Sequence, residues 1–508
     1  MSPAAAIQDS GLSARWRALG ALGMTRLVSD SRHVAAGDTF VAYPGEKLDG
    51  RKFIAQAIER GASSVLWERS DFRWRPSWKV RNAPVDHLKR HAGEIAAAVY
   101  GRPSARLWMV GVTGTNGKTS CSHWIAHALT RLQRRCGVVG TLGSGFAGRL
   151  EPIGNTTPDA VWLQGRLRDF LSQRARAVSM EVSSHGLAQD RVAGVEFDVA
   201  LLTNLTRDHL DYHGTMRSYR AAKARLFRCS GLKHAVVNLD DAFGAALVEP
   251  TQRRGVRTIG YGFDRTLPPA LRGRRVPRLV GRNLRMGADG VAFDVATPWG
   301  EARVESRLIG RFNASNLLGT LAVLLASDNT LDASVAALAQ VRPVPGRTER
   351  YGGGRRPLVV VDYAHTPDAL ENVLRTLREL MDSKDSPAKR PGKLVCVFGC
   401  GGDRDRGKRP EMGRIAATLA DEAIVTSDNP RSEDPQAIID DILEGMNGNS
   451  EAVADRAQAI ESAVRRAGAG DVILVAGKGH EQYQEIAGIR HPFSDAAVVR
   501  SALARRAS

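Results

Sequence analysis

The sequence predicts an α/β protein built from three domains, with mostly parallel sheets in the second and third. Two observations support this fold class. Apolar runs of strand length alternate with helical stretches along most of the 508 residues, a pattern typical of sheets covered by helices. Two segments rich in Gly and Pro, residues 100–104 and 341–357, interrupt the alternation. Boundaries placed there divide the chain into residues 1–102, 103–345 and 346–508.

The first domain is predicted to be a small α/β unit. Residues 37–43 form an apolar run with the composition of a strand, and residues 50–62 have helical periodicity. A second apolar run follows in residues 63–68. The order strand, helix, strand is typical of an α/β unit.

The second domain is predicted to hold a mostly parallel sheet with helices on both faces. Its predicted strands are residues 107–112, 177–182, 198–204 and 234–240. Residues 276–310 contain short alternating runs instead, which predict an antiparallel insert. Residues 313–327 are predicted to form a helix that begins at their Asn and Ser residues.

The third domain is predicted to be a Rossmann-like α/β unit, because four apolar runs each end in a polar loop. The runs are residues 358–363, 393–398, 422–427 and 471–477, and the loops are residues 364–368, 399–407, 428–434 and 477–484. In open parallel sheets, ligands bind at the carboxyl ends of the strands. All four loops are rich in Gly, Asp, Arg and His, so a ligand site is expected there.

The formal net charge of +18 admits nucleic acid, a membrane surface or anionic small substrates as partners. The arginines are scattered, without a long basic block or a basic strip interleaved with aromatics, so no nucleic-acid partner is expected. No run of ~18 apolar residues and no signal-type core occur, which predicts a cytoplasmic protein without membrane insertion. Five cysteines without a C-x-x-C pair indicate a reducing compartment; Cys396 and Cys400 have no His at zinc spacing, so no metal site is expected there.

Residues 110–120, "VGVTGTNGKTS", are predicted to bind nucleotide phosphates. The segment follows a strand and opens a helix, and backbone N–H groups of such a glycine loop can cradle phosphates. Lys118 would reach the β- and γ-phosphates, and Thr119 would offer its hydroxyl to Mg²⁺. The strict pattern G-x-x-x-x-G-K-[ST] is not met, since its first glycine falls at Val112.

A reaction at the γ-phosphate requires charge neutralisation, usually by Mg²⁺ held by one or two carboxylates and phosphate oxygens. Glu181 stands at a predicted strand end and is a candidate ligand, and His209 is another. His209 also follows Asp208, and such neighbours often form a hydrogen-bonded pair. From spacing alone, Lys223 is more typical of a solvated helix residue than of a functional one.

Taken together, these motifs resemble the Mur ligase family over nearly the whole chain. The matching segments stand in the family's order: residues 111–120, 155–159, 180–187, 203–227, 310–316, 362–374, 399–410, 428–431 and 477–481. Residues 29–50 also resemble the family's uridine-binding domain. Within the family, the resemblance is greatest to the members that add the third residue of the peptidoglycan stem peptide.

The resemblance implies a UDP-binding domain, a central ATPase with a P-loop, and a C-terminal domain that binds an amino acid. It implies that the D-Glu γ-carboxylate of a UDP-muramoyl dipeptide attacks ATP, that an acyl phosphate forms, and that the amine of the amino acid displaces phosphate. The protein would mainly position the substrates and neutralise their charge. A cytoplasmic monomer that closes by rotation near residue 345 is the further expectation.

The resemblance also assigns residues to roles. Lys118, Lys223, Glu181 and His209 match catalytic positions; Thr119, Glu181, His209 and Lys223, the last as a carbamate, match metal-binding positions. The ATP-binding positions are Gly114, Thr115, Asn116, Gly117, Lys118, Thr119, Ser120, Asn313, Arg347, Asp362 and His365. The positions that contact the UDP-muramoyl dipeptide are Ser29, Ser31, Glu46, Lys47, Leu48, Asn155, Thr156, Thr157, Ser183, Gln189 and Arg191. The amino-acid pocket consists of Arg404, Asp428, Asn429, Pro430, Arg431, Gly477 and Glu481.

Arg431 bears on which amino acid is added. Diaminopimelate differs from L-lysine chiefly by a carboxylate at the far end, and a planar guanidinium matches a carboxylate with two parallel hydrogen bonds. Pro430 restricts the backbone of Asn429 and so narrows the approach. The sequence therefore predicts meso-diaminopimelate as the substrate.

Three alternative functions share some of these motifs. One is the same ligase with L-lysine or another amino acid. A second is a ligase like folylpolyglutamate synthase, against which the uridine-domain segment and residues 428–431 argue. A third is a nucleotide-dependent nucleic-acid-binding protein, against which the expected absence of an aromatic-rich basic surface motif argues.

Overall fold

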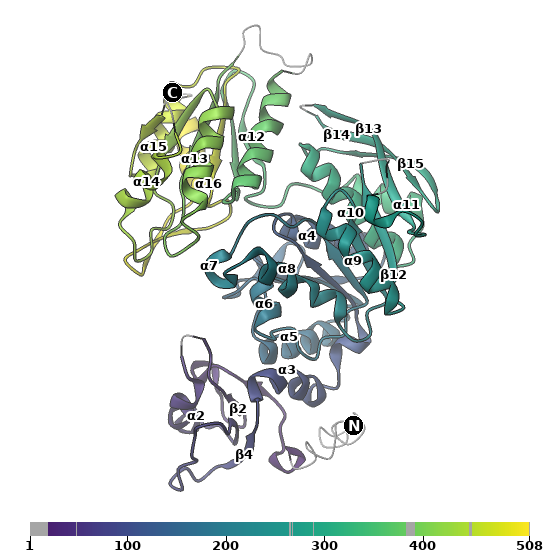
Figure 1. The fold of residues 1–508 in the computed structure, drawn as a ribbon. Coiled ribbons are helices and arrows are strands. Elements are labelled where there is room, and N and C mark those ends of the chain that lie inside the picture. The colour runs from purple at the N-terminus through teal and green to yellow at the C-terminus, as the bar shows by residue number, and fades with distance from the viewer. Residues whose placement is uncertain are drawn as a thin grey trace.

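Three large sheets, each with its own helices, follow one another along the described part of the chain, and a two-stranded hairpin accompanies the third (Figure 1). The computed structural model describes residues 19–506 apart from 47, 264–265, 267, 288, 383–391 and 447–449. The predicted site residue Lys47 therefore lies outside the described residues. The N-terminal sheet lies at the bottom of Figure 1, the central sheet to the right and the C-terminal sheet at the upper left. The predicted fold class, three α/β domains with mostly parallel sheets, is confirmed.

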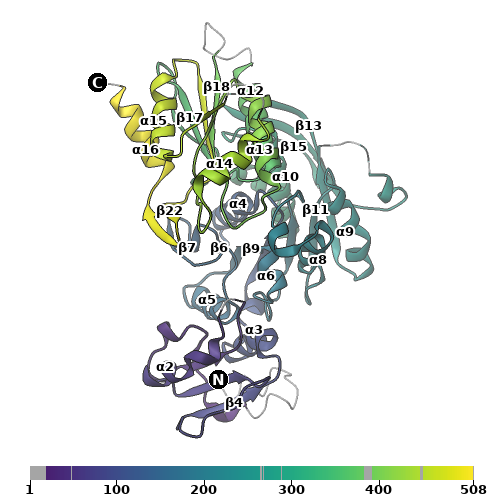
Figure 2. The same cartoon turned by 60° about the vertical axis from the view of Figure 1, so that its left-hand side comes forward.

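The first sheet has four parallel strands in the order β1-β2-β3-β4. Its elements are β1 Leu27–Val28, η2 Ser31–His33, β2 Thr39–Ala42, η3 Gly50–Phe53, α2 Ile54–Glu59, β3 Ser64–Glu68, β4 Arg81–Val85, α3 Leu88–Val99 and η4 Pro103–Arg106. The apolar residues of β2 and β3 alternate between two core clusters, one on each face of the sheet. Helix α3 packs against α5 of the central part, and the two lie side by side in Figures 1 and 2.

The sequence analysis expects no basic strip interleaved with aromatics, and this expectation is wrong in the first domain. Residues 72–81 alternate basic and aromatic side chains. The segment between β3 and β4 contains no helix, and aromatic rings cover the sheet there instead. Trp74 stacks on Trp67 with ring centroids 5.8 Å apart and meets Trp78 edge-on at 5.0 Å. Because these rings pack on one another and on the core cluster, they fill the place of a crossover helix rather than offering splayed stacking faces.

The central sheet has eleven strands in the order β15-β14-β13-β12-β11-β10-β5-β9-β6-β7-β8. They are β5 Trp108–Thr113, β6 Cys136–Gly140, β7 Gly143–Phe146, β8 Arg149–Glu151, β9 Ala177–Glu181, β10 Val199–Leu202, β11 His234–Asn238, β12 Arg257–Gly262, β13 Arg278–Gly287, β14 Gly290–Thr297 and β15 Gly300–Ser306. The predicted antiparallel insert corresponds to β13–β15. A second antiparallel edge, β6–β8, was not predicted.

Helices cover both faces of the central sheet. The elements are α4 Lys118–Arg131, α5 Ala160–Ser172, α6 Ser184–Ala188, α7 Leu210–His213, α8 Met216–Ala224, η5 Leu226–Arg228, α9 Ala242–Arg253, η6 Pro269–Leu271, α10 Arg311–Ala326 and α11 Leu331–Leu338. Helices α4, α10 and α11 share one core cluster, and α5, α6 and α9 share the other. Helix α10 begins at Arg311, before the predicted start at Asn313, because Gly310 with φ 92° ends the preceding loop.

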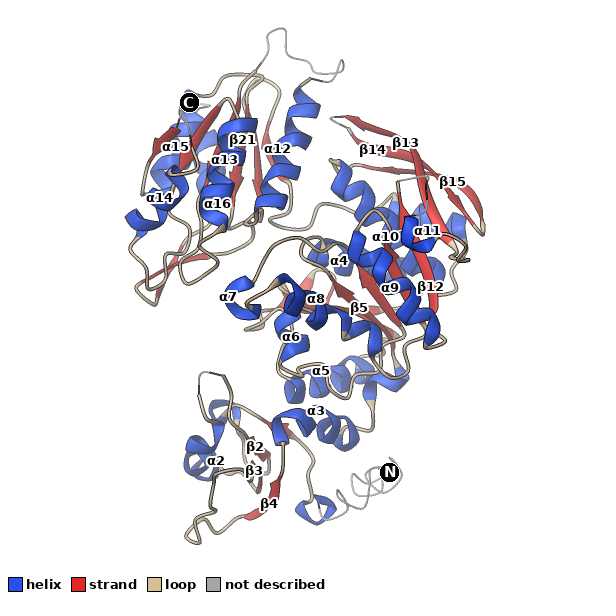
Figure 3. Ribbon diagram, viewed as in Figure 1, coloured by secondary structure: helices blue, strands red, loops and turns tan. Residues whose placement is uncertain are grey.

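The third sheet has the order β16-β17-β21-β18-β19-β20, with only β16 antiparallel to its neighbour, and β22 and β23 form a separate hairpin. The strands are β16 Glu349–Gly352, β17 Leu358–Asp362, β18 Leu394–Phe398, β19 Glu422–Val425, β20 Ser450–Ala452, β21 Val472–Ala476, β22 Tyr483–Ile486 and β23 Ile489–Pro492. The helices are α12 Pro367–Met381, α13 Lys408–Leu419, α14 Pro435–Leu443, α15 Arg456–Arg466 and α16 Asp495–Arg505. Figure 3 shows helices α12 to α16 in blue around the red strands of this domain. Within the part of the chain that the structure describes, no helix is long and apolar enough to cross a bilayer.

Candidate active site

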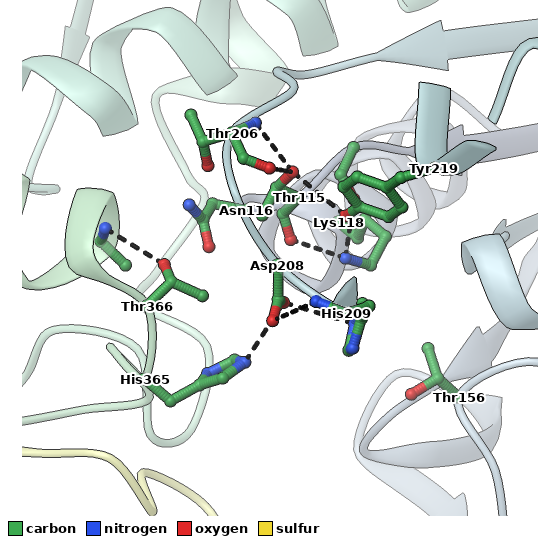
Figure 4. Close-up of polar contacts among 12 residues, drawn as sticks. Thr115, Asn116, Lys118, Thr156, Thr206, Asp208, His209, Tyr219, His365 and Thr366 are labelled. Carbon is green, nitrogen blue, oxygen red and sulfur yellow. Dashed lines mark hydrogen bonds and ion pairs between the residues drawn. The ribbon is translucent and has the colours of Figure 1, made fainter. Parts of the chain in front are cut away.

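A cavity of about 460 Å³ lies between the central and third domains. The central domain contributes the segment between β5 and α4, the end of β9, and α8. The third domain contributes the loop after β17 and the segment before β16. The carboxyl ends of the parallel strands β5, β9, β10 and β17 thus meet at one place, as expected for ligand sites of open α/β sheets. Figure 4 shows polar contacts at this site.

The predicted phosphate loop runs from the end of β5 into α4, and two of its glycines are required by close packing. A Cβ on Gly114, whose φ is 151°, would lie 1.9 Å from Thr203 Oγ1. A Cβ on Gly117, with φ 84°, would lie 2.6 Å from Asn316 Oδ1. The backbone of the loop therefore lies in close contact with Thr203 and Asn316. The loop ends at the N-terminus of the 14-residue helix α4, and a helix N-terminus favours binding of an anion.

Two lysines donate to the same carbonyl oxygen in this loop. Lys118 Nζ donates to Gly114 O at 2.9 Å and to Thr115 O at 2.7 Å, and Lys223 Nζ donates to Gly114 O at 2.7 Å. Burial lowers the pKa of both amines, and the Lys118 charge lowers the pKa of Lys223 further. An anion beside the two amines would relieve their repulsion, so the pair favours phosphate binding.

Glu181, at the end of β9, is fully buried beside the phosphate loop. Its Oε2 accepts from Thr119 Oγ1 at 2.9 Å, and its Oε1 accepts from the Thr141 backbone N–H at 2.7 Å. A Cβ on Gly140 would lie 2.2 Å from Oε1, so the glycine makes room for the carboxylate. The structure thus brings the predicted metal ligands Glu181 and Thr119 into direct contact.

His209 lies in the same cavity and interacts with Asp208 rather than with Glu181. Its Nε2 is 3.3 Å from Asp208 Oδ2, and burial lowers the pKa of His209 to about 2. His365 of the third domain approaches the same Oδ2 at 3.8 Å (Figure 4). Burial alone would raise the pKa of Asp208, but the nearby His365 ring and the positive charge of Lys408 hold that pKa well below the ordinary value.

Several predicted nucleotide-binding residues connect the two domains across the cavity. Arg347 Nη2 donates to Thr119 Oγ1 at 3.2 Å, and its guanidinium lies 4.4 Å from the centre of the Tyr363 ring. Asn116 Nδ2 donates to Asp368 Oδ2 at 3.0 Å. The remaining predicted positions, Ser120, Asn313, Asp362 and His365, also line the cavity.

Burial raises the pKa of the Asp362 carboxyl, which accepts the Thr348 N–H at 2.6 Å. Asn313, in the first turn of α10, donates to Ile309 O at 2.9 Å. Both side chains are buried and hydrogen-bonded, so contacts within the protein hold them in place.

The residues predicted to contact the UDP-muramoyl dipeptide fall into two groups. Asn155, Thr156, Thr157, Ser183 and Arg191 line the cavity. The first-domain residues lie beyond it: Ser31 donates to Gln56, and Leu48 is 69% exposed. Gln189 Nε2 donates to Tyr212 Oη at 3.2 Å, and the same hydroxyl donates to Glu46 Oε1 at 2.8 Å. The structure therefore joins Glu46 of the first domain to Gln189 of the central one through a tyrosine.

Asp159 is a second connection between these domains, and sequence reasoning missed it. Its Oδ1 accepts from Ser29 Oγ at 2.9 Å, and its Oδ2 accepts from Tyr43 Oη at 2.5 Å. The same carboxylate caps α5 by accepting the N–H groups of Val161 and Trp162. The signal was present, since an Asp one residue before a helical run is a typical N-cap.

The predicted amino-acid pocket is a cluster at the carboxyl ends of β18, β19 and β21. Arg404 reaches the cavity, and Asp428, buried, neighbours Gly477, whose added Cβ would lie 2.5 Å from Asp428 Oδ2. Arg431 follows Pro430 with a left-handed φ of 55° and donates from Nη1 to Gly402 O at 2.6 Å. The turn therefore holds the guanidinium against the glycine-rich loop after β18.

The pocket also contains Lys478, which sequence reasoning did not single out. Its side chain is fully buried, and Nζ lies 2.9 Å from both Asn429 Oδ1 and Glu481 Oε2. A lysine inside a motif offers no sequence signal that distinguishes a buried partner from a solvated one.

No group of three or more His, Cys, Asp and Glu side chains among the described residues is arranged to hold a metal ion. Mg²⁺ does not need such a cage, because it is usually held by one or two carboxylates, phosphate oxygens and water. Glu181 and the Thr119 hydroxyl beside the phosphate loop fit that requirement. The five cysteines are unpaired, and four of them are buried.

Comparison with known proteins gives consistent matches along the chain. The family model described as Mur ligase family, catalytic domain, matches residues 24–100; the Mur ligase middle domain matches residues 112–324; and the Mur ligase, glutamate ligase domain, matches residues 346–479.

Two curated relatives share the name UDP-N-acetylmuramoyl-L-alanyl-D-glutamate--2,6-diaminopimelate ligase. The protein from Nitrosomonas europaea is 50% identical over 94% of this chain and 92% of its own. The protein from Chromobacterium violaceum is 51% identical over 95% of this chain and 94% of its own. A solved structure with the same name is 37% identical, with a TM-score of 0.66, and covers 96% of each chain.

Proposed function

The chain belongs to the Mur ligase family, and we propose that it is an ATP-dependent ligase for meso-2,6-diaminopimelate. The amino acid would be joined to the D-Glu γ-carboxylate of UDP-N-acetylmuramoyl-L-Ala-D-Glu, a step in peptidoglycan precursor synthesis. One observation carries the proposal: a single cavity is lined by the phosphate loop, Glu181 and Lys223 of the central domain and by Arg347 and His365 of the third. The names of relatives at 50% and 51% identity support the choice of substrates.

The reaction needs activation, because a free carboxylate is a poor acyl donor. A γ-carboxylate oxygen attacks the γ-phosphorus, the bond to the β–γ bridging oxygen breaks, and ADP leaves. The amine nitrogen then bonds to the acyl carbon, the carbon–oxygen bond to phosphate breaks, and the nitrogen releases a proton to water. The chain's residues contribute positioning and charge neutralisation: Lys118 faces the phosphates from the loop, and Arg347 faces them from the third domain.

Glu181 and Thr119 would hold Mg²⁺, and His209 is a further candidate ligand. When bound, Mg²⁺ neutralises charge on the phosphate oxygens. The buried carboxylate and hydroxyl are already in contact at 2.9 Å, so the two oxygen donors are positioned together. The pairing of His209 with Asp208 makes it the weaker ligand of the set.

Lys223 is proposed to act as a carbamate. Carbamylation requires the neutral amine, which forms a nitrogen–carbon bond to CO₂ and releases a proton. The lowered pKa of the buried Lys223 amine favours that neutral form. The resulting anion would stand beside Lys118 and the phosphate loop, where it could hold a second Mg²⁺.

Selection of the amino acid is proposed to rest on Arg431, supported by Arg404, Asp428, Asn429, Gly477 and Glu481. A carboxylate at the far end of diaminopimelate would receive charge-assisted hydrogen bonds of ~1.5–3 kcal/mol each. L-Lysine has no such group, so it would leave the guanidinium desolvated without a partner.

The UDP-muramoyl dipeptide is proposed to bind between the first and central domains. Ser29, Ser31, Glu46, Lys47 and Leu48 would contact it from the first domain, and Asn155, Thr156, Thr157, Ser183, Gln189 and Arg191 from the central one.

We place the domain boundaries at residues 102 and 345, and propose a cytoplasmic monomer that closes around the linker near 345.

The test is an amino-acid panel. The purified chain is supplied with ATP, Mg²⁺ and UDP-N-acetylmuramoyl-L-Ala-D-Glu, and product formation is compared between meso-diaminopimelate and L-lysine. We expect product with diaminopimelate and little with lysine, and Lys118→Ala should remove ATP-dependent phosphate release. Equal use of lysine would overturn the substrate assignment, and unchanged phosphate release in K118A would overturn the phosphate-loop assignment.

A further inference from the structure

We infer that Lys478 is a positioning residue of the amino-acid pocket, which fixes the Glu481 carboxylate and the Asn429 amide in the orientation that receives the incoming amino acid. The inference rests on the proposed function, because Asn429 and Glu481 are pocket residues only under that proposal. It adds to the pocket a residue that is itself not expected to touch the substrate.

The three side chains form a closed triangle of hydrogen bonds. Lys478 Nζ donates to Asn429 Oδ1 at 2.9 Å and to Glu481 Oε2 at 2.9 Å. Asn429 Nδ2 closes the triangle by donating to Glu481 Oε2 at 2.8 Å. The Lys478 side chain is 0% exposed and that of Glu481 15%, so the triangle forms the floor of the cluster and Glu481 is its accessible corner.

The triangle determines which atoms remain for a ligand. Asn429 Oδ1 also accepts the Glu485 backbone N–H at 2.9 Å, so the amide is held with Nδ2 towards Glu481. Glu481 Oε2 accepts two hydrogen bonds, whereas its Oε1 accepts none from the described residues. Oε1 is therefore the oxygen that can accept from an ammonium group of the amino acid.

Close packing of the glycines on either side of Lys478 restricts movement of the backbone that carries the lysine. A Cβ on Gly477 would lie 2.5 Å from Asp428 Oδ2, and a Cβ on Gly479 would lie 2.6 Å from Gly346 O. The lysine is thus set between the β19 loop and the segment that precedes β16. Since His480 Nδ1 is also 3.4 Å from Arg347 Nη1, one short loop contacts both the amino-acid cluster and a proposed nucleotide-binding residue.

A purely structural role makes a different prediction. If Lys478 only balanced the Glu481 charge in the interior, its loss would destabilise the domain. The KM values for ATP, the UDP-muramoyl dipeptide and the amino acid would then rise together. If it positions Glu481 and Asn429, its loss should act on the amino acid alone. The KM values of the three substrates, measured separately, distinguish the two roles.

The experiment uses the full chain and the variants Lys478→Met, Glu481→Gln and the double variant. Ile460→Ala, a truncation in the core cluster that α15 and α16 form with the third sheet, is the matched control for stability. We expect K478M to raise the KM for the amino acid about 10- to 100-fold, the loss of one or two charged hydrogen bonds. The KM values for ATP and the UDP-dipeptide should change less than about twofold, and I460A should lower Tm without this split.

The double variant keeps the test decisive if K478M alone does not fold, because it removes both buried charges. We expect its amino-acid KM to rise by less than the product of the two single effects, since Lys478 acts in part through Glu481. An unchanged amino-acid KM in K478M, a parallel rise of all three KM values, or fully additive effects of the two substitutions would overturn the inference. If the wild type joins lysine and not diaminopimelate, the proposed substrate fails, and the same variants are assayed with lysine, so the two failures are separable.

Discussion

At the scale of single residues, the most unusual position is Lys223. It is 1% exposed, and apart from the face of Tyr219 its amine contacts a carbonyl oxygen it shares with Lys118. Among the described residues no carboxylate forms an ion pair with this amine, and a buried lysine in that situation lowers stability, which is typical of functional positions. The proposed carbamate would turn this cation into an anion beside the phosphates.

Replacing Lys223 by Ala should reduce turnover at least about 100-fold, comparable to removal of an electrostatic group in other active sites. Bicarbonate should not restore activity to K223A, because no amine remains to react, whereas a short carboxylate such as acetate should restore part of it. The measurement is product formation at saturating substrates. Lys233→Ala, at a lysine whose side chain is 59% exposed, is the control, and near-wild-type turnover in K223A would contradict the carbamate role.

Arg431 allows a second prediction at this scale. Because its φ is left-handed, Arg431→Asn is a better test than alanine, since Asn tolerates that backbone. We expect R431N to raise the KM for diaminopimelate about tenfold or more, with the KM for ATP unchanged. The ratio of kcat/KM for diaminopimelate to kcat/KM for lysine should fall. Arg431→Lys keeps the charge but not the two-pronged geometry, and an undiminished preference in both variants would refute the assignment.

At the scale of elements, the start of α5 combines two functions. Asp159 caps the helix and at the same time holds Ser29 and Tyr43 of the first domain. An N-cap usually serves only its helix. Here the cap also sets how the first domain sits on the central one.

Asp159→Ala should therefore do more than remove a cap. Loss of an N-cap costs ~0.5–2 kcal/mol, and that loss should be matched by Asp455→Ala, which removes the cap of α15 without touching another domain. Only D159A should also raise the KM for the UDP-muramoyl dipeptide, by several-fold. Thermal unfolding and substrate KM values measure the two effects, and identical behaviour of the two variants would show that the interdomain contact has no role.

The sequence was most informative where elements are long and apolar. The strands β5, β9, β10, β17, β18, β19 and β21 were all predicted, because each is a buried run. Strands β6 and β7 were missed because glycines interrupt their apolar pattern, and β8 was missed because it has three residues and is largely exposed. Strand β16 was missed because its half-exposed residues lie in a segment that is otherwise typical of a linker.

At the scale of the whole molecule, buried histidines should make stability depend on pH. Burial is the main cause that lowers the pKa of His123 and His185 to about 4, of His480 to about 3 and of His209 to about 2. These pKa values lie below the ordinary 6.5 of histidine. Between pH 6.5 and the lowered values, the four histidines therefore stay neutral in the folded protein but take up protons in the unfolded chain. The stability that these histidines contribute is fully present above pH 6.5 and is lost progressively as the pH falls from 6.5 towards 2.

Urea unfolding at pH 7.5, 6.5 and 5.5 measures this dependence before most carboxylates titrate. We expect the midpoint to fall between pH 6.5 and 5.5, and His123→Asn to reduce the slope by about one proton. Equal midpoints at pH 7.5 and 5.5 would contradict the burial of neutral histidines.

Contacts between domains could be predicted less well from the sequence than the elements themselves. Phosphate-loop residues and Glu181 follow from motifs, but the approach of Asn116 to Asp368 joins positions far apart in the chain. No periodicity or local motif encodes such a pair, because it depends on how two separately folded cores sit together. The Tyr212 contact with Glu46 is invisible in the sequence for the same reason.

The two lysines that share the Gly114 carbonyl also bear on what happens after the bond is made. The proposed reaction would release inorganic phosphate beside the same cations that are proposed to attract the nucleotide. Phosphate at millimolar concentration should therefore raise Tm and compete with ATP, whereas chloride at equal ionic strength should do neither. Product inhibition by phosphate, and slower turnover as phosphate accumulates, would follow directly from the charge arrangement of one loop.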